Sequence, residues 1–210
     1  MEKLILIGAG GYAKSVLDSI DYFNYKVEGF IDEFSNEQEH LGYPILGKCL
    51  EDLEESNKYV YFISIGNNIK RKYWFDKLIS QKKRIINVVD NSAIVSPNAN
   101  IGNGCFVGKM AIINSGAIVG DNSIINSRAL IEHGCMVEKH VNMSTNSVIN
   151  GDVKIGEGSF IGSCSVTIGQ LSIGSWSTVG AGAVVVKPVG DGITVAGVPA
   201  KTIKKGAMLG

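Results

Sequence analysis

The sequence predicts two units of different fold class: a small parallel α/β unit, residues 1–90, followed by an all-β unit, a parallel β-helix, residues 91–210. The first observation is an aliphatic residue that returns every six positions from Val95 to Val185. The second is a small residue four positions after most of these, which suits the narrow interior of a prism-shaped coil. The third is an apolar run, Leu4–Ile7, that enters a glycine-rich turn, as strands buried in a parallel sheet do.

The six-residue repeat is the strongest of these signals, because chance does not produce so long a series of apolar residues at one spacing. Thr167 departs from the pattern, and its neighbour Ile168 is expected to supply the missing side chain. Three hexads per coil predict about five coils, and residues eighteen apart should then stack about 4.8 Å apart. The large positions are Val95, Ile101, Val107, Ile113, Val119, Ile125, Ile131, Val137, Met143, Ile149, Ile155, Ile161, Thr167, Ile173, Val179 and Val185.

The N-terminal unit is expected to place its turns at one edge of a parallel sheet. The strands that we expect are Leu4–Ile7, Val27–Ile31, Tyr59–Ile65 and Arg84–Val89. The turns that follow the first three are Gly8–Lys14, Asp32–Glu33 and Gly66–Asn68. A glycine turn between a strand and a helix can hold a phosphate, and an acidic residue after the second strand can bind a nucleoside. Ala13 stands where GxGxxG has its third glycine, so a plain strand-to-helix turn is the alternative.

Composition limits the classes of partner and location. Twenty basic residues balance twenty acidic ones, and without a basic run there is no reason to expect nucleic acid as a partner. The sequence has neither an eighteen-residue apolar stretch nor a signal peptide, so we expect no membrane association and a cytoplasmic location. The cysteines show no CxxC spacing, and Cys105 and Cys135 occupy small positions of the repeat. We expect reduced, buried thiols rather than a disulfide or a metal site.

Histidine is the candidate for chemistry within the repeat. His133 follows Glu132 near a corner of the coil, and stacking at eighteen residues predicts that it lies beside Gly151. A glycine there would leave its N–H open to a molecule bound next to the imidazole. A solvated corner histidine is the alternative, but the adjacent glutamate and the facing glycine favour a functional role. For His140 a solvated side chain and a functional role are both open, and His40 is expected to be a surface residue.

Several motifs along the chain resemble those of a known family, the bacterial hexapeptide-repeat sugar acyltransferases. This family includes the sialic acid O-acetyltransferases and the N-acetyltransferases of nucleotide-linked 4-amino sugars of the bacillosamine, perosamine and viosamine type. The similarity extends from end to end. The motifs that carry it are Gly8–Gly11 with Lys14, Asp32, Ile65–Asn68 with Arg71, Ile131–His133, and Gly197–Lys201.

The resemblance implies a Rossmann-like N-terminal domain, a left-handed β-helix and a homotrimer with active sites between neighbouring β-helices. It implies acetyl-CoA as co-substrate without a metal ion, and an acceptor that is a nucleotide-linked amino-deoxy sugar carrying UDP, dTDP or GDP. The product would serve the synthesis of bacterial surface glycans or glycoproteins. A sugar hydroxyl as acceptor, as in the sialic acid branch, is an alternative. A non-catalytic trimeric scaffold or sensor is a second one.

The resemblance also implies the roles of individual residues. His133 would be the general base, Glu132 the carboxylate that orients it, and Gly151 the amide that stabilises the oxyanion. The positions along acetyl-CoA would be Asn142, Ser163, Ala181, Gly182, Gly197 and Lys201. The nucleotide-sugar residues would be Gly10, Gly11, Tyr12, Lys14, Asp32, Glu33, Gly66, Asn67 and Asn68. The family often has His-Gly at Tyr12-Ala13 and a second histidine at Asn142, so the sequence departs from the pattern there.

Overall fold

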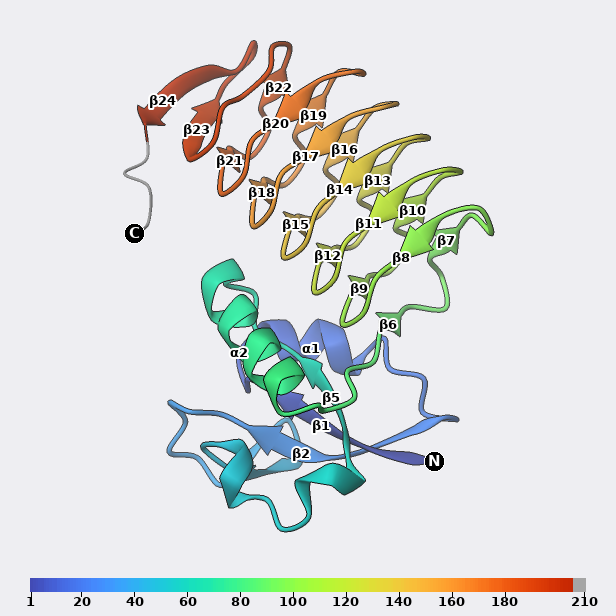
Figure 1. The fold of residues 1–210 in the computed structure, drawn as a ribbon, viewed down its shortest axis with the longest axis vertical. Helices are drawn as coiled ribbons and strands as arrows, with labels where there is room; N and C mark the ends of the chain where they lie inside the picture. Colours follow the sequence, from blue (N-terminus) through green and yellow to red (C-terminus); the bar gives the residue numbers. More distant parts are fainter. Residues whose placement is uncertain (206–210) are drawn as a thin grey trace.

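The computed structural model describes residues 1–205, so residues 206–210 of the expected β-helix unit lie outside its described part. Figure 1 shows an α/β unit packed against the first coils of a long stack of β-strands. The coils follow one another in sequence order, from β7 near the α/β unit to β23 and β24 at the far end (Figure 1). No helix in the described part is long and apolar enough to cross a membrane.

The α/β unit is one sheet with strand order β3-β4-β2-β1-β5 and a helix on each face. Its strands are β1 (Glu2–Ile7), β2 (Tyr25–Ile31), β3 (Glu39–His40), β4 (Tyr43–Gly47) and β5 (Val60–Ile63). Its helices are α1 (Tyr12–Leu17), α2 (Asn68–Ser80) and the short 3₁₀ turns η1 (Leu50–Asp52) and η2 (Ser56–Lys58). Leu4 and Leu6 pack in the core that contains α1, while Ile5 and Ile7 pack in the core that contains α2. This alternation is the two-residue period of a strand buried on both faces.

Two expectations for the N-terminal half are wrong. The segment Arg84–Val89 is not a strand of the first sheet: β6 (Val88–Val89) pairs with β9 (Phe106–Val107) of the β-helix, and Ile85 forms an isolated bridge with Tyr61. The short connection thus passes directly from one sheet to the other. His40 is not a simple surface residue, because it belongs to β3, is half-buried and packs edge-on against Phe30 at 5.5 Å.

Within residues 88–205 the β-helix has three faces, which we name in chain order. Face 1 consists of β7 (Ile94–Val95), β10 (Ile112–Ile113), β13 (Leu130–Ile131), β16 (Val148–Ile149), β19 (Val166–Thr167) and β22 (Val184–Val185). Face 2 consists of β8 (Asn100–Ile101), β11 (Ile118–Val119), β14 (Met136–Val137), β17 (Lys154–Ile155) and β20 (Ser172–Ile173). Face 3 consists of β6, β9, β12 (Ile124–Ile125), β15 (Asn142–Met143), β18 (Phe160–Ile161), β21 (Thr178–Val179), β23 (Ile193–Ala196) and β24 (Lys201–Lys205). The turns between faces are corner 1–2, corner 2–3 and corner 3–1.

The interior of the β-helix is filled by the large and small residues of the repeat. Ile113, Ile131 and Ile149, which are eighteen residues apart, pair on face 1 and are fully buried. Thr167 occupies the next interior position and is also fully buried, whereas Ile168 is 41% exposed. The expectation that Ile168 fills this position is therefore wrong. The Thr167 hydroxyl has no hydrogen-bond partner among the described residues, which typically costs about 1–3 kcal/mol.

Arg71 connects the α/β unit to the β-helix. Its side chain is 1% exposed and donates from Nε to the Asn122 carbonyl (2.9 Å) and from Nη2 to the His140 carbonyl (2.7 Å). Its Nη1 donates to the carbonyl of Gly66 (3.0 Å), at the carboxyl edge of the first sheet. Burial lowers the pKa of Arg71 to about 10, so the guanidinium remains charged at neutral pH. One cation thus holds a loop of the α/β unit against corner 2–3.

His140 lies in the same junction, and its role there is structural. The side chain is 3% exposed, its Nδ1 is 2.8 Å from the Asn122 amide nitrogen, and its ring packs edge-on against Phe75 at 5.5 Å. Burial, together with the positive charges of Lys72 and Arg71, lowers the pKa of His140 to about 4. The folded protein therefore keeps this imidazole neutral.

The depressed pKa of His140 predicts a loss of stability in weak acid. The unfolded chain gains a proton at this site below about pH 6.5, whereas the folded chain gains it near pH 4. The free energy of unfolding should therefore fall as the pH drops through this window, by at most about 1.4 kcal/mol per pH unit. Urea unfolding at fixed protein concentration should show a smaller decrease for His140→Asn, which suits the positive φ and does not titrate. Parallel curves for the two proteins would contradict this account.

Candidate active site

A cavity of about 490 Å³ opens at the carboxyl edge of the first sheet, where the turns were expected to converge. Six of the expected nucleotide-sugar residues line it: Gly10, Gly11, Tyr12, Asp32, Glu33 and Gly66. A Cβ at Gly10 or Gly11 would meet no atom within 4 Å, so both glycines face open space. Among the described residues, no hydrogen bond uses the N–H groups of Gly10 and Gly11. This turn is therefore free to donate to a phosphate.

The two acidic residues after β2 differ in what they can offer a ligand. Asp32 accepts hydrogen bonds from the backbone N–H groups of Ala9 (2.7 Å), Phe34 (2.9 Å) and Ser35 (2.9 Å). Its carboxylate therefore fixes the glycine turn and the loop after β2. Glu33 is exposed at the cavity and remains available to a ligand.

Three expected residues do not line the cavity. Lys14 is exposed on α1, and Asn67 caps α2 by accepting from the N–H of Lys70 (3.0 Å). Asn68 points into the junction between the units, where its Nδ2 donates to the carbonyl of Gly158 (2.9 Å). The segment Gly66–Asn68 thus contributes one residue to the cavity, one to the cap of α2 and one to the junction.

Sequence reasoning missed the side chains that form the mouth of the cavity. Phe34 and Tyr73 line it and are 68% and 56% exposed, and Lys70 lies 4.5 Å from the centre of the Phe34 ring. Exposed aromatic rings can stack on a flat base. The available signal was the spacing of Ile69 and Tyr73 on the outer face of α2, four residues apart after the glycine loop.

His133 lies in the turn of corner 1–2, directly below Gly151, so the predicted stacking is confirmed. A Cβ at Gly151 would lie 2.5 Å from His133 Cε1 and 2.7 Å from Nε2, which shows how closely the ring approaches the glycine. No hydrogen bond among the described residues uses the N–H of Gly151. The exposed imidazole and this open donor therefore lie next to each other.

Glu132 does not contact the imidazole through a hydrogen bond in the described chain. Its Oε2 accepts instead from the backbone N–H of His133 (3.2 Å). The carboxylate that projects into this turn belongs to Asp152, whose Oδ1 would clash with a Cβ at Gly134. The Glu132 carboxylate thus contacts the backbone of this turn, and the Asp152 carboxylate lies next to the side-chain position of Gly134.

The positions expected along acetyl-CoA lie at corner 3–1 and in the cap. Ser163 and Ala181 are eighteen residues apart in consecutive turns, and no hydrogen bond among the described residues uses their N–H groups. Gly182 adjoins open space, since a Cβ there would meet no atom within 4 Å. Two open N–H groups one coil apart suit the amide carbonyls of a pantetheine arm. Gly197 and Lys201 lie beside this corner, where Gly197 accepts from the N–H of Val184 (3.0 Å).

Asn142 lies away from these residues, on the outer side of face 3. Its side chain is 7% exposed, and its Nδ2 donates to the carbonyl of Gly66 (3.3 Å), which also accepts from Arg71. Its Oδ1 has no partner in the described part of the chain. Asn142 therefore links the β-helix to Gly66, which lines the cavity.

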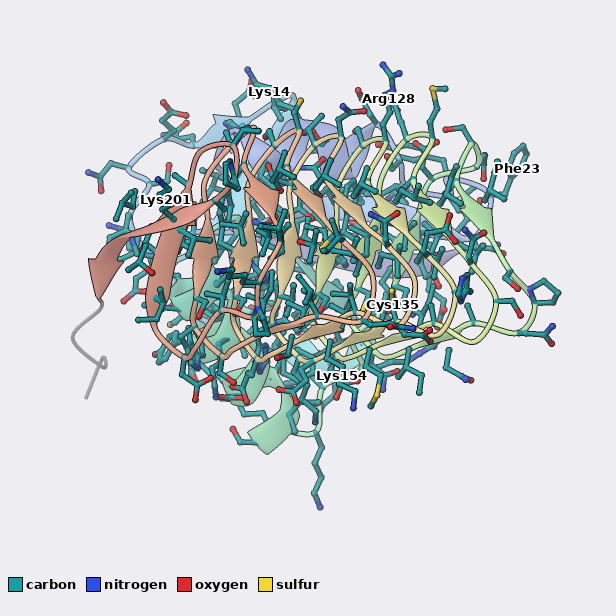
Figure 2. All side chains as sticks on the ribbon, turned by 90° about the horizontal axis from the view of Figure 1, so that it is seen from above. Lys14, Phe23, Arg128, Cys135, Lys154 and Lys201 are labelled. Carbon is teal, nitrogen blue, oxygen red and sulfur yellow. The ribbon has the colours of Figure 1, made fainter. Side chains whose placement is uncertain are left out.

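The candidate residues of one chain lie at different corners of the prism. His133 and Gly151 are at corner 1–2, Ser163 and Ala181 are at corner 3–1, and the cavity belongs to the unit attached at corner 2–3 and face 3. In Figure 2, Cys135, beside corner 1–2, and Arg128, in corner 3–1, lie on opposite sides of the coil stack. Within residues 1–205, no three His, Cys, Asp or Glu side chains gather as metal ligands would.

Two family models match the chain. Residues 3–78 match the PglD N-terminal domain, and residues 98–133 match the bacterial transferase hexapeptide of six repeats. An uncharacterized protein of Acanthamoeba polyphaga mimivirus is 30% identical over 105 residues, which are 49% of this chain and 20% of that protein. The chain thus spans about one fifth of the length of this curated relative.

Solved structures match almost the whole chain. A histidine-to-asparagine mutant of perosamine N-acetyltransferase from Caulobacter crescentus, in complex with CoA and GDP-perosamine, is 32% identical with a TM-score of 0.91, and the match covers 96% of each chain. The acetyltransferase domain of PglB from Neisseria gonorrhoeae, in complex with acetyl coenzyme A, is 32% identical with a TM-score of 0.90 over 96% of this chain and 99% of that one. The expected fold, a Rossmann-like α/β domain followed by a left-handed β-helix, is confirmed. The chain belongs to the hexapeptide-repeat sugar acetyltransferases.

Proposed function

We propose that this chain transfers the acetyl group of acetyl-CoA to the amino group of a nucleotide-linked amino sugar. The observation that carries the proposal is the pairing of the exposed His133 imidazole with the open N–H of Gly151 on an acetyltransferase β-helix. The cavity lined by Gly10, Gly11 and Glu33 supports a nucleotide-linked acceptor. Relatives that carry CoA together with GDP-perosamine support the same class of acceptor.

In the proposed reaction His133 acts as the general base. A sugar amine is mostly protonated near neutral pH and becomes a nucleophile when it loses a proton. An imidazole is suited to accept that proton at this pH. The exposed ring lies at the surface of corner 1–2, where an amine can reach it. His133 would hold the proton while the new carbon–nitrogen bond forms, and the proton can then pass to the departing thiolate.

Gly151 and corner 3–1 would serve the other reactant. When bound, acetyl-CoA supplies the thioester carbonyl that the amine attacks. The N–H of Gly151 would donate to the carbonyl oxygen as it gains negative charge, where loss of one donor typically costs about 10²–10³-fold in rate. The open N–H groups of Ser163 and Ala181 would hold the amide carbonyls of the pantetheine arm.

The N-terminal unit would hold the nucleotide end of the acceptor. The open N–H groups of Gly10 and Gly11 suit a diphosphate, and Phe34 and Tyr73 at the mouth suit the flat base. We propose that residues 1–90 bind the nucleotide sugar and that residues 91–210 transfer the acetyl group. We also propose that the protein acts in the cytoplasm and that its product serves the synthesis of bacterial surface glycans or glycoproteins.

We further propose that the protein acts as a homotrimer whose chains share each site. The outer positions of face 1 form an unbroken aliphatic stripe in register: Ile94, Ile112, Leu130, Val148, Val166 and Val184. Such a stripe favours contact with further copies. If face 1 of each copy turns toward a threefold axis, corner 1–2 of one chain meets corner 3–1 of the next. His133 of one chain would then approach Ser163 and Ala181 of its neighbour.

The proposed function predicts that acetylation depends on His133 and on a nucleotide-linked amino sugar. Wild-type protein should acetylate at least one of a panel of UDP-, dTDP- and GDP-linked 4-amino sugars, and the same sugar should raise its Tm because it binds the folded state. His133→Ala should lower kcat by about 10²-fold or more while keeping the Tm increase with the sugar. Acetylation of sugar hydroxyls alone would refute the N-acetyl assignment, and near wild-type turnover by His133→Ala would refute the base.

The contact between Gly151 and His133 predicts a sharp effect of one added methyl group. In Gly151→Ala the new Cβ would displace the imidazole, because Cε1 and Nε2 lie within 2.7 Å of its position. The ring is exposed and can turn outward, so the Tm should change little while kcat falls by roughly 10²-fold. Gly190→Ala is the matched control, since its Cβ would find its nearest neighbour, Ile193, at 3.8 Å. Full activity of Gly151→Ala would show that the position of the ring is unimportant.

A further inference from the structure

We propose that Asp152, rather than Glu132, is the carboxylate that positions the His133 imidazole. The inference rests on the proposed function, because it concerns the base of the same reaction. The residue that follows His133 is Gly134, whose missing side chain leaves a gap in the turn. Asp152 is stacked on Gly134 in the next coil, eighteen residues later, and its carboxylate fills that gap.

The geometry of consecutive coils brings the ring and this carboxylate together. The His133 ring reaches toward the upper coil and lies against Gly151, within 2.7 Å of a Cβ position there. The Asp152 side chain reaches toward the lower coil, so that Oδ1 would overlap a Cβ at Gly134. Residues 133 and 134 are consecutive, as are 151 and 152. The two side chains therefore extend from neighbouring positions of the same two turns, and no hydrogen bond joins them in the described chain.

The backbone fixes the position of Asp152 relative to His133. Its N–H donates to the carbonyl of His133 (3.0 Å), and its φ of 60° places it in the left-handed region. Aspartate and asparagine tolerate this conformation better than most residues. Gly134 also has a positive φ, of 67°, so the two turns have matching shapes. The residue that carries the carboxylate is thus hydrogen-bonded, through its backbone, to the residue that carries the base.

Glu132 is placed for another contact. Its Oε2 accepts from the backbone N–H of His133, which directs this carboxylate to the main chain. A carboxylate that bonds the second ring nitrogen of a catalytic histidine fixes its tautomer and stabilises its protonated form. A rotation of the exposed ring would turn its second nitrogen toward Asp152, whereas Glu132 is already hydrogen-bonded to the backbone.

Kinetics of paired variants of the full chain test the assignment, with acetyl-CoA and the amino sugar that the wild type accepts. Asp152→Asn keeps the shape and suits the positive φ, and should lower kcat by about 10–100-fold while both KM values change little. Glu132→Gln should stay within about threefold of the wild-type kcat, since it keeps an oxygen for the His133 N–H.

Moving the carboxylate from residue 152 to residue 134 tests whether the lost activity can be rescued. In the double variant Gly134→Asp with Asp152→Gly, the acid is supplied from the residue next to His133, in the space that Asp152 vacates. Both positions have a positive φ that aspartate and glycine accept. This variant should recover most of the kcat that Asp152→Asn loses, which a purely structural role of Asp152 would not produce.

The outcomes separate this inference from the proposed function. Wild-type kcat for Asp152→Asn, or an equal loss for Glu132→Gln, would overturn the role of Asp152. If one of these two results is obtained while His133→Ala is inactive in the same assay, His133 remains the base and only the inference about Asp152 has failed. If His133→Ala is fully active, the proposed mechanism has failed as well.

Discussion

The packing of the β-helix interior imposes the constraint on which the rest of the structure depends. Each coil closes because large residues such as Ile131 alternate with small ones such as Cys135, and both are buried. Backbone hydrogen bonds then lock successive coils in register, as when the N–H of Glu132 donates to the carbonyl of Ile149 (3.1 Å). Because the register is fixed, residue identity at one corner determines what a side chain one coil away can meet. His133 meets Gly151 for this reason.

The same register explains why one chain holds the parts of the site separately. A prism offers corners that face different directions, and the α/β unit covers face 3 through buried contacts such as Arg71 with Asn122 and His140. His133, at corner 1–2, lies at the corner opposite face 3, on which the unit with the cavity is attached. The aliphatic stripe of face 1 lies between the corner with the base and the corner with the open N–H groups. Assembly across face 1 is therefore the simplest way to bring these groups together.

Much of this arrangement could be predicted from the sequence. A six-residue repeat with three repeats per coil specifies the fold, and it also specifies which residues stack on each other in consecutive coils. The stacking of His133 below Gly151 and the convergence of Gly10, Asp32 and Gly66 followed from such rules. Other features depend on side-chain direction, which periodicity does not encode. His140 has the same sequence signature as a solvated corner histidine, yet it is buried because α2 packs over it.

The roles of the acidic residues were harder to predict for the same reason. Asp32 follows β2 as a ligand-binding acid would, but its carboxylate is taken up by the N–H groups of its own loop and of Ala9. Glu132 adjoins His133 in sequence, whereas Asp152 adjoins it in space. We propose that adjacency in space selects the carboxylate here, because the residue after His133 is a glycine and Asp152 of the next coil extends into the space that a side chain there would occupy.

A mixed-trimer experiment tests the central claim, that the base of one chain serves the acceptor held by another. Gly11→Trp should block the cavity without backbone strain, since Gly11 has φ −60° and its Cβ faces open space. His133→Ala removes the base, and each variant alone should be inactive. Co-expression and purification of trimers carrying both should restore roughly a third of the wild-type rate, because one of the three sites in each such trimer joins an intact base from one chain to an intact cavity from the next. Activity no higher than the sum of the two variants alone would contradict the account.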